Sequence, residues 1–346
     1  MSMSAIKVST TAPRDVVVAG TAARPGGAVQ TRLPVPGLAP EHLPYVTLFG
    51  GTEPGPVVTV VAGMHGCEIS SIEAGRRLSV RLEGRVRRGT VIVVPVVNLA
   101  GFFGRTLYFN PVDGKNLNRS FPGDPDGTAS ERLAHAIMTH LVAPCDVVFD
   151  LHGGDSVEAL DPFMMAERPP GMPMNLAALQ MAEWFGLDQV ISGDVSGAML
   201  SEATKLGKAA LLGECGQQGL LSEVAAQRLS DGVENVLAHL GMIDPHPDRP
   251  ELLRAAASRP VFRPGWTWVS SSHTGYWLPD PAVQCGRELS EGALVGTIRP
   301  LEHGGETVEI RTPHAGRMIF LVSSLSTSPG TPLYAIAHPP EAWPGA

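Results

Sequence analysis

The sequence predicts an α/β fold with a mostly parallel central sheet, followed by a small all-β domain. Three apolar, β-branched runs, at 57–61, 90–97 and 146–151, alternate with amphipathic stretches. Runs this apolar are typical of strands buried on both faces, which occur mainly in parallel sheets covered by helices. Beyond about residue 260 the helical period disappears, and Gly and Pro punctuate short strand-like pieces, as in all-β domains.

Four stretches between the strands have the pattern of helices. The clearest spans 130–142, because Thr128 and Glu131 are spaced as a capping box just before an apolar face. The remaining helices are expected at 68–83, 174–186 and 220–240, with a short strand at 209–212.

The chain, at 346 residues, exceeds the usual size of one domain and is expected to have three parts. Residues 1–44, rich in Gly, Pro and Thr, form an extended N-terminal segment. The α/β domain covers 45–245, and a proline-rich break at 244–250 separates it from a C-terminal β domain at 260–346. The strands expected in that last domain are 264–270, 293–298, 306–311, 317–322 and 332–337.

Composition excludes several classes of protein. The 43% hydrophobic content indicates a globular chain, and the net charge of −8 argues against nucleic acid or an anionic membrane as partner. No apolar stretch approaches the ~20 residues of a membrane span, and the first residues lack the apolar h-region that is typical of a signal peptide. We therefore expect a cytoplasmic protein; its oligomeric state is left open, a homo-oligomer included. Four cysteines without a CxxC pair are expected as buried thiols: Cys67, Cys145, Cys215 and Cys285.

Two polar clusters follow predicted strands. His65 and Glu68 come directly after the run at 57–61, and His152 ends the run at 146–151. Because ligands bind at the carboxyl ends of strands in open α/β sheets, these side chains are expected to meet. Two histidines and a glutamate form a typical catalytic zinc set with one position left for water, so one zinc ion per chain is predicted. Asp150 either orients His152 or, by strand alternation, turns away.

Other polar residues provide candidates for the chemistry around this metal. Glu214 follows the strand at 209–212 between two glycines, where a carboxylate can take a proton from water and deliver it to a leaving amine. In the polar loop 110–123, Arg119 offers a planar fork for a carboxylate or an oxyanion, with the Asn118 amide beside it.

These motifs resemble the succinylglutamate desuccinylase/aspartoacylase family, relatives of the zinc carboxypeptidases. The matching pieces are HGCE (65–68), DGKNLNRSFPG (113–123), DLHGG (150–154) and GECG (213–216), in family order and spacing. The resemblance implies a carboxypeptidase-like α/β/α sandwich, with residues 45–245 as a zinc hydrolase domain whose site is narrowed by the C-terminal β domain.

Residue by residue, the resemblance makes His65, Glu68 and His152 the zinc ligands and Glu214 the acid/base. It also implies that Asn118 and Arg119 grip a substrate carboxylate. Many relatives carry an arginine shortly before the NPxDGxNLNR stretch, which polarises the scissile carbonyl. Here that place holds Tyr108, and Arg105 lies three residues earlier, so both are candidates for this role.

The C-terminal domain also resembles a biotinyl or lipoyl hammerhead. Such carriers need a lysine, and none follows Lys208, so a wall or lid role is expected.

The function predicted from these residues is hydrolysis of the amide bond of an N-acyl amino acid or related small molecule. Two alternatives share the ligand set or the fold: a metallocarboxypeptidase acting on peptide C-termini, and a non-catalytic small-molecule binder.

Overall fold

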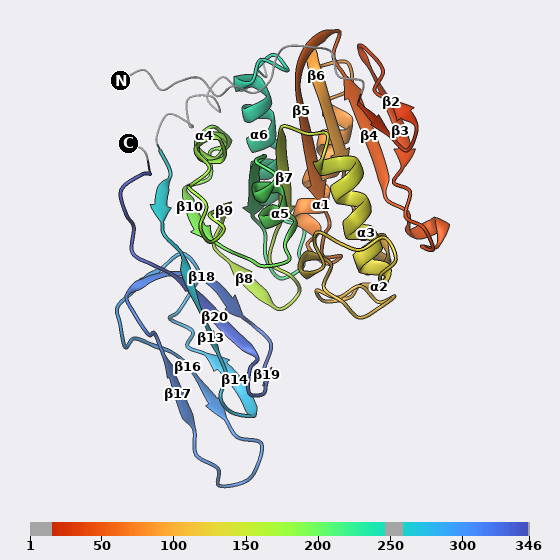
Figure 1. Cartoon of the computed structure of the whole chain (residues 1–346). Coiled ribbons are helices and arrows are strands. Elements are labelled where there is room, and N and C mark those ends of the chain that lie inside the picture. Colours follow the sequence, from red (N-terminus) through yellow and green to blue (C-terminus); the bar gives the residue numbers. More distant parts are fainter. Residues whose placement is uncertain (1–15, 246–258, 345–346) are drawn as a thin grey trace.

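A mostly parallel nine-stranded sheet forms the centre of the computed structural model, which describes residues 16–245 and 259–344 (Figure 1). Five of its eight strand pairings are parallel, so the predicted α/β architecture is confirmed. Across the sheet the strands are β12 (Val261–Arg263), β10 (Gln189–Gly193), β9 (Phe163–Glu167), β11 (Ala209–Glu214), β7 (Val147–His152), β5 (Glu53–Ala62), β6 (Arg88–Val94), β4 (Tyr45–Gly50) and β3 (Gly27–Arg32).

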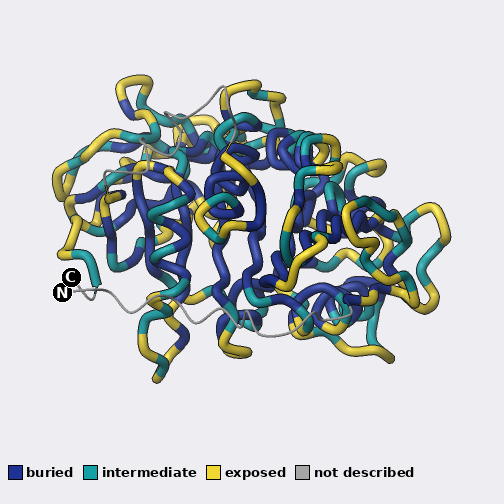
Figure 2. Tube along the Cα trace, turned by 90° about the horizontal axis from the view of Figure 1, so that it is seen from above, coloured by how far each residue is buried: buried dark blue, intermediate teal, exposed yellow. Residues whose placement is uncertain are grey.

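Alternation along each strand builds two hydrophobic cores, one on each face of the sheet. In β5, Val57 and Val61 belong to one core, while Val58 and Val60 belong to the other. The first core is covered by α3 (Ala129–Ile137) and α5 (Met199–Lys205). The second is covered by α1 (Ile69–Arg81), α4 (Leu176–Phe185) and α6 (Glu223–His239). Figure 2 shows buried residues gathered in this interior and exposed residues around its rim.

The predicted helices are present, with local differences at their ends. The Glu131 carboxylate accepts a hydrogen bond from the Thr128 backbone N–H at 2.8 Å, as the capping box requires. The predicted 130–142 helix changes to a wider π-type turn after Ile137. The shorter elements are β1 (Val17–Val18), β2 (Thr21–Ala22), η1 (Pro40–His42), α2 (Leu99–Gly104), η2 (Leu117–Arg119) and η3 (Met138–Val142).

The C-terminal region consists of two antiparallel sheets packed around Trp277 and Tyr334. One contains β13 (Trp266–Ser270), β20 (Pro332–Ala337), β18 (Gly316–Val322) and β15 (Glu288–Leu289); the other contains β17 (Val308–Arg311), β16 (Leu294–Arg299), β14 (Gly275–Pro279) and β19 (Ser326–Thr327). The first sheet also takes in β8 (Glu158–Leu160) from the α/β part, which pairs with β18. The β8–β18 pairing connects the two parts close to the carboxyl end of β7.

Several elements were absent from the sequence prediction. The strands β9, β10, β12 and β14 were not predicted, and β3 turns part of the N-terminal segment into a sheet edge. The proline-rich break at 244–250 lies mostly outside the described residues, and β12, just after residue 260, belongs to the central sheet. Among the described residues, no helix combines the length and apolar character needed to cross a bilayer.

The fold makes a prediction about Phe149, which is fully buried in β7 and packs 5.7 Å from the Phe185 ring. Phe149→Ala should lower the free energy of unfolding by about 3–5 kcal/mol, because it removes contacts and leaves a cavity. Urea denaturation measures this, with Phe103→Ala as the matched control, since Phe103 is 66% exposed. A loss as small as that of the control would contradict the assigned core.

Candidate active site

Buried polar side chains gather where β5, β7 and β11 end. His152 and Glu214 are the last residues of β7 and β11, and the two are direct neighbours in the parallel register. His65 and Glu68 lie in the turn from β5 into α1. A Cβ at Gly66 would lie 2.2 Å from the Gly101 carbonyl carbon, so this turn requires glycine to pass so close to α2.

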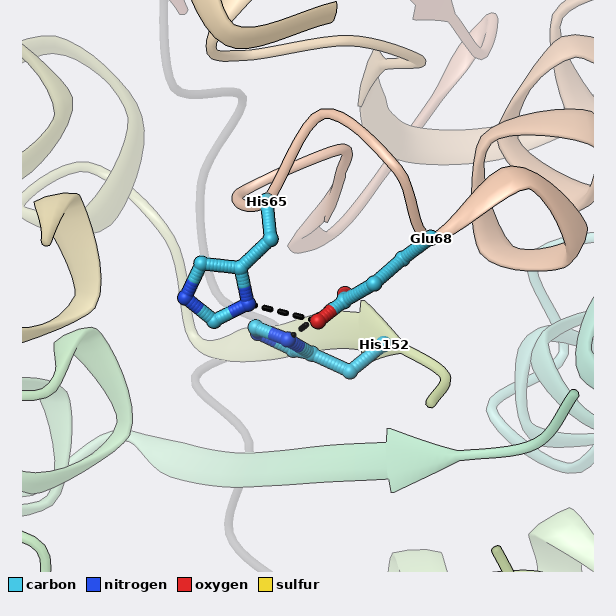
Figure 3. Close-up of side chains that lie close together, drawn as sticks. All are labelled: His65, Glu68 and His152. Carbon is cyan, nitrogen blue, oxygen red and sulfur yellow. Dashed lines mark hydrogen bonds and ion pairs between the residues drawn. The ribbon is translucent and has the colours of Figure 1, made fainter. Parts of the chain in front are cut away.

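The ligand atoms of His65, Glu68 and His152 all lie within 4.8 Å of one another (Figure 3). The Glu68 carboxylate stands between the two rings, with Oε1 2.5 Å from His65 Nδ1 and Oε2 2.9 Å from His152 Nδ1. The other ring nitrogens also have polar neighbours, since His65 Nε2 lies 3.1 Å from Asn116 Oδ1 and His152 Nε2 lies 3.0 Å from Asp150 Oδ1. The Asp150 carboxylate therefore faces His152 rather than turning away, while His65 is held by its hydrogen bond with Asn116.

These donors fit a zinc ion in type and in burial. Two imidazole nitrogens and one carboxylate converge, and beside them Glu214 Oε2 is buried without a hydrogen bond among the described residues. Burial opposes the charged form of Glu68, but His152 and His65 outweigh it and lower its pKa. Burial raises the pKa of Glu214 well above its usual value. A cation here would compensate the desolvated carboxylates.

A cavity of about 760 Å³ opens over these ligands. Its floor is one face of the central sheet, because strand alternation turns every second side chain of β9 and β11 toward it. Those side chains are Phe163, Met165 and Glu167 of β9 and Leu212 and Glu214 of β11. The C-terminal region supplies Trp266, Trp268, Phe320 and His338 as a wall.

The loop before α3 brings Asn118 and Arg119 to the same cavity through η2. Asn116 Oδ1 accepts the Asn118 N–H at 2.8 Å, and Asn118 Oδ1 accepts the Met199 N–H at 3.1 Å, which fixes the loop. Arg119 donates to the Asn118 carbonyl at 2.6 Å, and no described carboxylate lies within ion-pair distance of its guanidinium. Arg119 is thus available to bind an anionic group of a ligand.

The structure separates the two candidates for the carbonyl-polarising role. Tyr108 lines the cavity with its ring edge-on to His65, 5.9 Å between centroids, and its backbone N–H donates to Asp155 at 2.9 Å. Burial and the nearby Glu158 carboxylate raise the pKa of the Tyr108 hydroxyl. Arg105 is exposed and lines a different cavity, of about 480 Å³, beside Cys67. Of the predicted site residues, Arg105 alone is not brought to the metal ligands.

Sequence reasoning missed three acidic residues that line the cavity: Glu158, Glu167 and Asp194. Glu158 starts β8, a short strand visible only through its pairing with β18. Glu167 ends the apolar run FMMAE, and an acid in such a run was the one available signal.

The cysteines carry no sign of a nucleophile. Cys145 and Cys215 are buried as predicted, whereas Cys67 and Cys285 are half-buried. Burial raises the pKa of the Cys67 thiol and keeps it protonated.

The chain is similar to known proteins over most of its length. Residues 54–240 match the model of the succinylglutamate desuccinylase/aspartoacylase catalytic domain. The chain belongs to this family. It is 30% identical over 292 residues to the N-alpha-acetyl-L-2,4-diaminobutyric acid deacetylase of Halomonas elongata, with 82% of each chain covered.

Solved structures show the same fold. The succinylglutamate desuccinylase/aspartoacylase of Rhodobacter sphaeroides aligns at a TM-score of 0.72 with 25% identity, covering 86% of this chain and 89% of the other. The product-bound ectoine utilization protein EutE (DoeB) of Ruegeria pomeroyi aligns at 0.77 with 24% identity, covering 90% and 96%. Family membership and the deacetylase relative support a deacylase, a hydrolase of amide bonds.

Glu167 gives the site a pH dependence that can be measured. Burial raises its pKa from 4.5 to about 7, against hydrogen bonds from Ser201 and the Val195 N–H; the Asp194 charge raises it further and Lys205 lowers it. Between these two values the folded protein keeps a proton that the unfolded chain releases, so stability falls as pH rises through that window. The loss between pH 4 and pH 8 from this group is about 3 kcal/mol.

In Glu167→Gln this contribution should disappear, because the amide does not titrate and keeps an acceptor for the Val195 N–H. Urea denaturation across this pH range should show a shallower decline in the variant than in the wild type. Equal declines would contradict the assigned origin of the effect.

Proposed function

We propose that this protein is a zinc-dependent amidohydrolase that removes the acyl group from an N-acyl amino acid or a related small molecule. The observation that carries the proposal is the convergence of His65, Glu68 and His152 beside Glu214, on the floor of a cavity walled by the C-terminal domain. The deacetylase from Halomonas elongata, named for N-alpha-acetyl-L-2,4-diaminobutyric acid, supports an N-acyl amino acid as substrate.

In this proposal His65, Glu68 and His152 hold the zinc ion. When bound there, zinc supplies a Lewis acid that lowers the pKa of water toward ~7 and polarises a carbonyl. Glu214 Oε2, buried and without a hydrogen bond among the described residues, takes a proton from the attacking water. The water oxygen bonds to the acyl carbon, and Glu214 then returns the proton to the amide nitrogen as the C–N bond breaks. The products are a carboxylate and an amine.

Tyr108 and Arg119 act on other parts of the substrate. The Tyr108 hydroxyl donates a hydrogen bond to the carbonyl oxygen as negative charge develops on it, replacing the arginine that many relatives have. Arg119, with no carboxylate partner among the described residues, binds the substrate carboxylate, and Asn118 holds it in place.

The wall formed by the C-terminal domain favours a small substrate over a peptide. A carboxypeptidase needs an open groove for the chain that precedes the scissile bond, whereas Trp266, Trp268 and Phe320 close in on this cavity. Turnover of N-acyl amino acids but not of blocked dipeptides is the expected result. Turnover of dipeptides alone would overturn the proposal in favour of a carboxypeptidase.

The role of Glu214 is tested by Glu214→Gln. Because the amide does not accept a proton, kcat should fall by about 10²–10⁴ while about one zinc ion per chain is retained. Steady-state kinetics together with elemental analysis of the same preparation measure both quantities. Near wild-type turnover would refute the assignment, and loss of zinc would make Glu214 part of the metal site instead.

The role of Tyr108 is tested by Tyr108→Phe, with Arg105→Ala as the matched control. Loss of a donor to the developing oxyanion should lower kcat by about 10²-fold and change KM much less. Arg105 lies outside the cavity, so its variant should stay within about twofold of the wild type. The reverse pattern would assign the polarising role to Arg105.

A further inference from the structure

The active-site cavity has a second polar end, formed by Glu167 and Asp194. Glu167 Oε1 accepts the Val195 N–H at 3.1 Å and Oε2 accepts the Ser201 hydroxyl, so the carboxylate is rigidly held. Asp194, one residue after β10, is exposed at the cavity surface. These two acids act on each other electrostatically, whereas Glu214 is influenced by the group around His152.

Strand register separates this end from the metal ligands. Phe163 pairs with Glu214 in the antiparallel β9–β11 ladder, and Glu167 lies four residues further along β9 on the same face. At about 3.3 Å per residue, the two backbones are roughly 13 Å apart, and both side chains reach into the cavity between them. Met165 and Leu212 form an apolar floor along this path.

An aromatic wall runs along the cavity, and its Trp268–Phe320 part lies at the end with Glu214, because the Phe320 ring packs 5.8 Å from the ring of Phe163, the neighbour of Glu214. Trp268 and Phe320 stack with 5.3 Å between their centroids, and both line the cavity. The Trp266 ring packs so closely on Gly193 that a Cβ there would lie 2.1 Å from it, which brings the indole next to Asp194. Aromatic faces combined with carboxylates recognise alkylammonium groups.

The charge balance of the cavity also favours a cationic group. Arg119 is the one lysine or arginine among the described residues that line it, against five acidic side chains: Glu68, Glu158, Glu167, Asp194 and Glu214. Burial raises the pKa of Glu158, Glu167 and Glu214, and a cation bound beside these groups would favour their charged forms. The carboxylates near His152 are the ones a metal ion would compensate. No described lysine or arginine forms an ion pair with Glu167 or Asp194. Arg119 acts electrostatically on Glu167, and Lys205, which pairs with Glu202 outside the cavity, acts electrostatically on both acids.

We propose that Glu167 and Asp194 bind a free ammonium group of the substrate, so that the substrate is a diamino acid acylated on one nitrogen. The acyl amide lies at the metal, the carbon chain crosses the Met165 and Leu212 floor, and Arg119 takes the carboxylate. This inference rests on the proposed deacylase function and adds the substrate class to it. Glu167 and Asp194 are specificity residues.

The test compares substrates that differ only in the ammonium group, using the zinc-loaded full-length protein. The first pair is Nα-acetyl-L-2,4-diaminobutyrate and Nα-acetyl-L-norvaline, in which a methyl replaces the ammonium. The second pair is Nγ-acetyl-L-2,4-diaminobutyrate and 4-acetamidobutanoate, which lacks the α-ammonium. The ratio of kcat/KM within a pair measures recognition of the ammonium, and the pair with the larger ratio identifies which nitrogen is free.

The wild type should prefer the ammonium-bearing member of one pair, and this ratio should fall by about ten- to hundredfold in Glu167→Gln and in Asp194→Asn. Glu309→Gln is the matched control, because Glu309 pairs with Arg311 on the exposed strand β17 and does not line the cavity. Its ratio should match the wild type. A fall of equal size in Glu309→Gln would reduce the effect to long-range charge and overturn the subsite.

Failure of this inference and failure of the proposed function give different results. If neutral N-acetyl amino acids are hydrolysed and neither pair shows a preference for the ammonium, the subsite is overturned and the deacylase function stands. If no substrate is hydrolysed, calorimetric binding of L-2,4-diaminobutyrate and L-norvaline to the wild type and Glu167→Gln decides. Tighter binding of the diamino acid that is lost in the variant supports the subsite, and equal binding overturns it.

Discussion

The parallel register between β7 and β11 is the constraint on which the rest of the site depends. It sets His152 directly beside Glu214, and the neighbouring parallel strand β5 ends where the turn with His65 and Glu68 begins. A slip of one residue would turn His152 to the opposite face of the sheet. The alternation that fills two hydrophobic cores with valine and leucine therefore also fixes which polar side chains meet at the strand ends.

This arrangement places ionisable side chains in a buried position, where loss of solvation disfavours their charged forms. His65, Glu68, His152 and Glu214 are all at most 9% exposed, and the cluster sits between two apolar cores. Little of their surface is open to solvent, so the two histidines and Glu68 compensate one another, and the Glu68 carboxylate contacts both rings. The same desolvation that raises the pKa of Glu214 makes its carboxylate a stronger base than an exposed one. Burial of the Glu214 carboxylate thus costs folding free energy and at the same time increases its basicity.

The sequence predicted the centre of this arrangement because its signals are local. An apolar run predicts a strand, and a histidine or glutamate just after the run is predicted to lie at the carboxyl end of that strand, as for His65 and His152. The residues that were missed depend on contacts between distant parts of the chain. β8 is a strand because it pairs with β18, which lies far away in the sequence. β9 pairs with β11 in the antiparallel direction, whereas most pairs in this sheet are parallel. Arg105 and Tyr108 are three residues apart, and both have the left-handed backbone conformation. The chain therefore turns sharply between them, and Tyr108 is the residue that faces His65.

The C-terminal domain is positioned beside the site by β8, a strand of the α/β part that pairs with β18 of the C-terminal sheet. Because β8 begins six residues after His152 and joins the C-terminal sheet, that sheet is anchored within one short loop of the cluster of His65, Glu68 and His152. Its strands β13 and β18 flank β20, so that Trp268 and Phe320 both lie opposite Ala335 and project together toward the cavity. The antiparallel C-terminal region thus provides a wall of the cavity. The polar cluster at the strand ends therefore comes from the α/β sheet and the aromatic wall from the β region, so a substitution in the wall changes the shape of the cavity without changing the polar cluster.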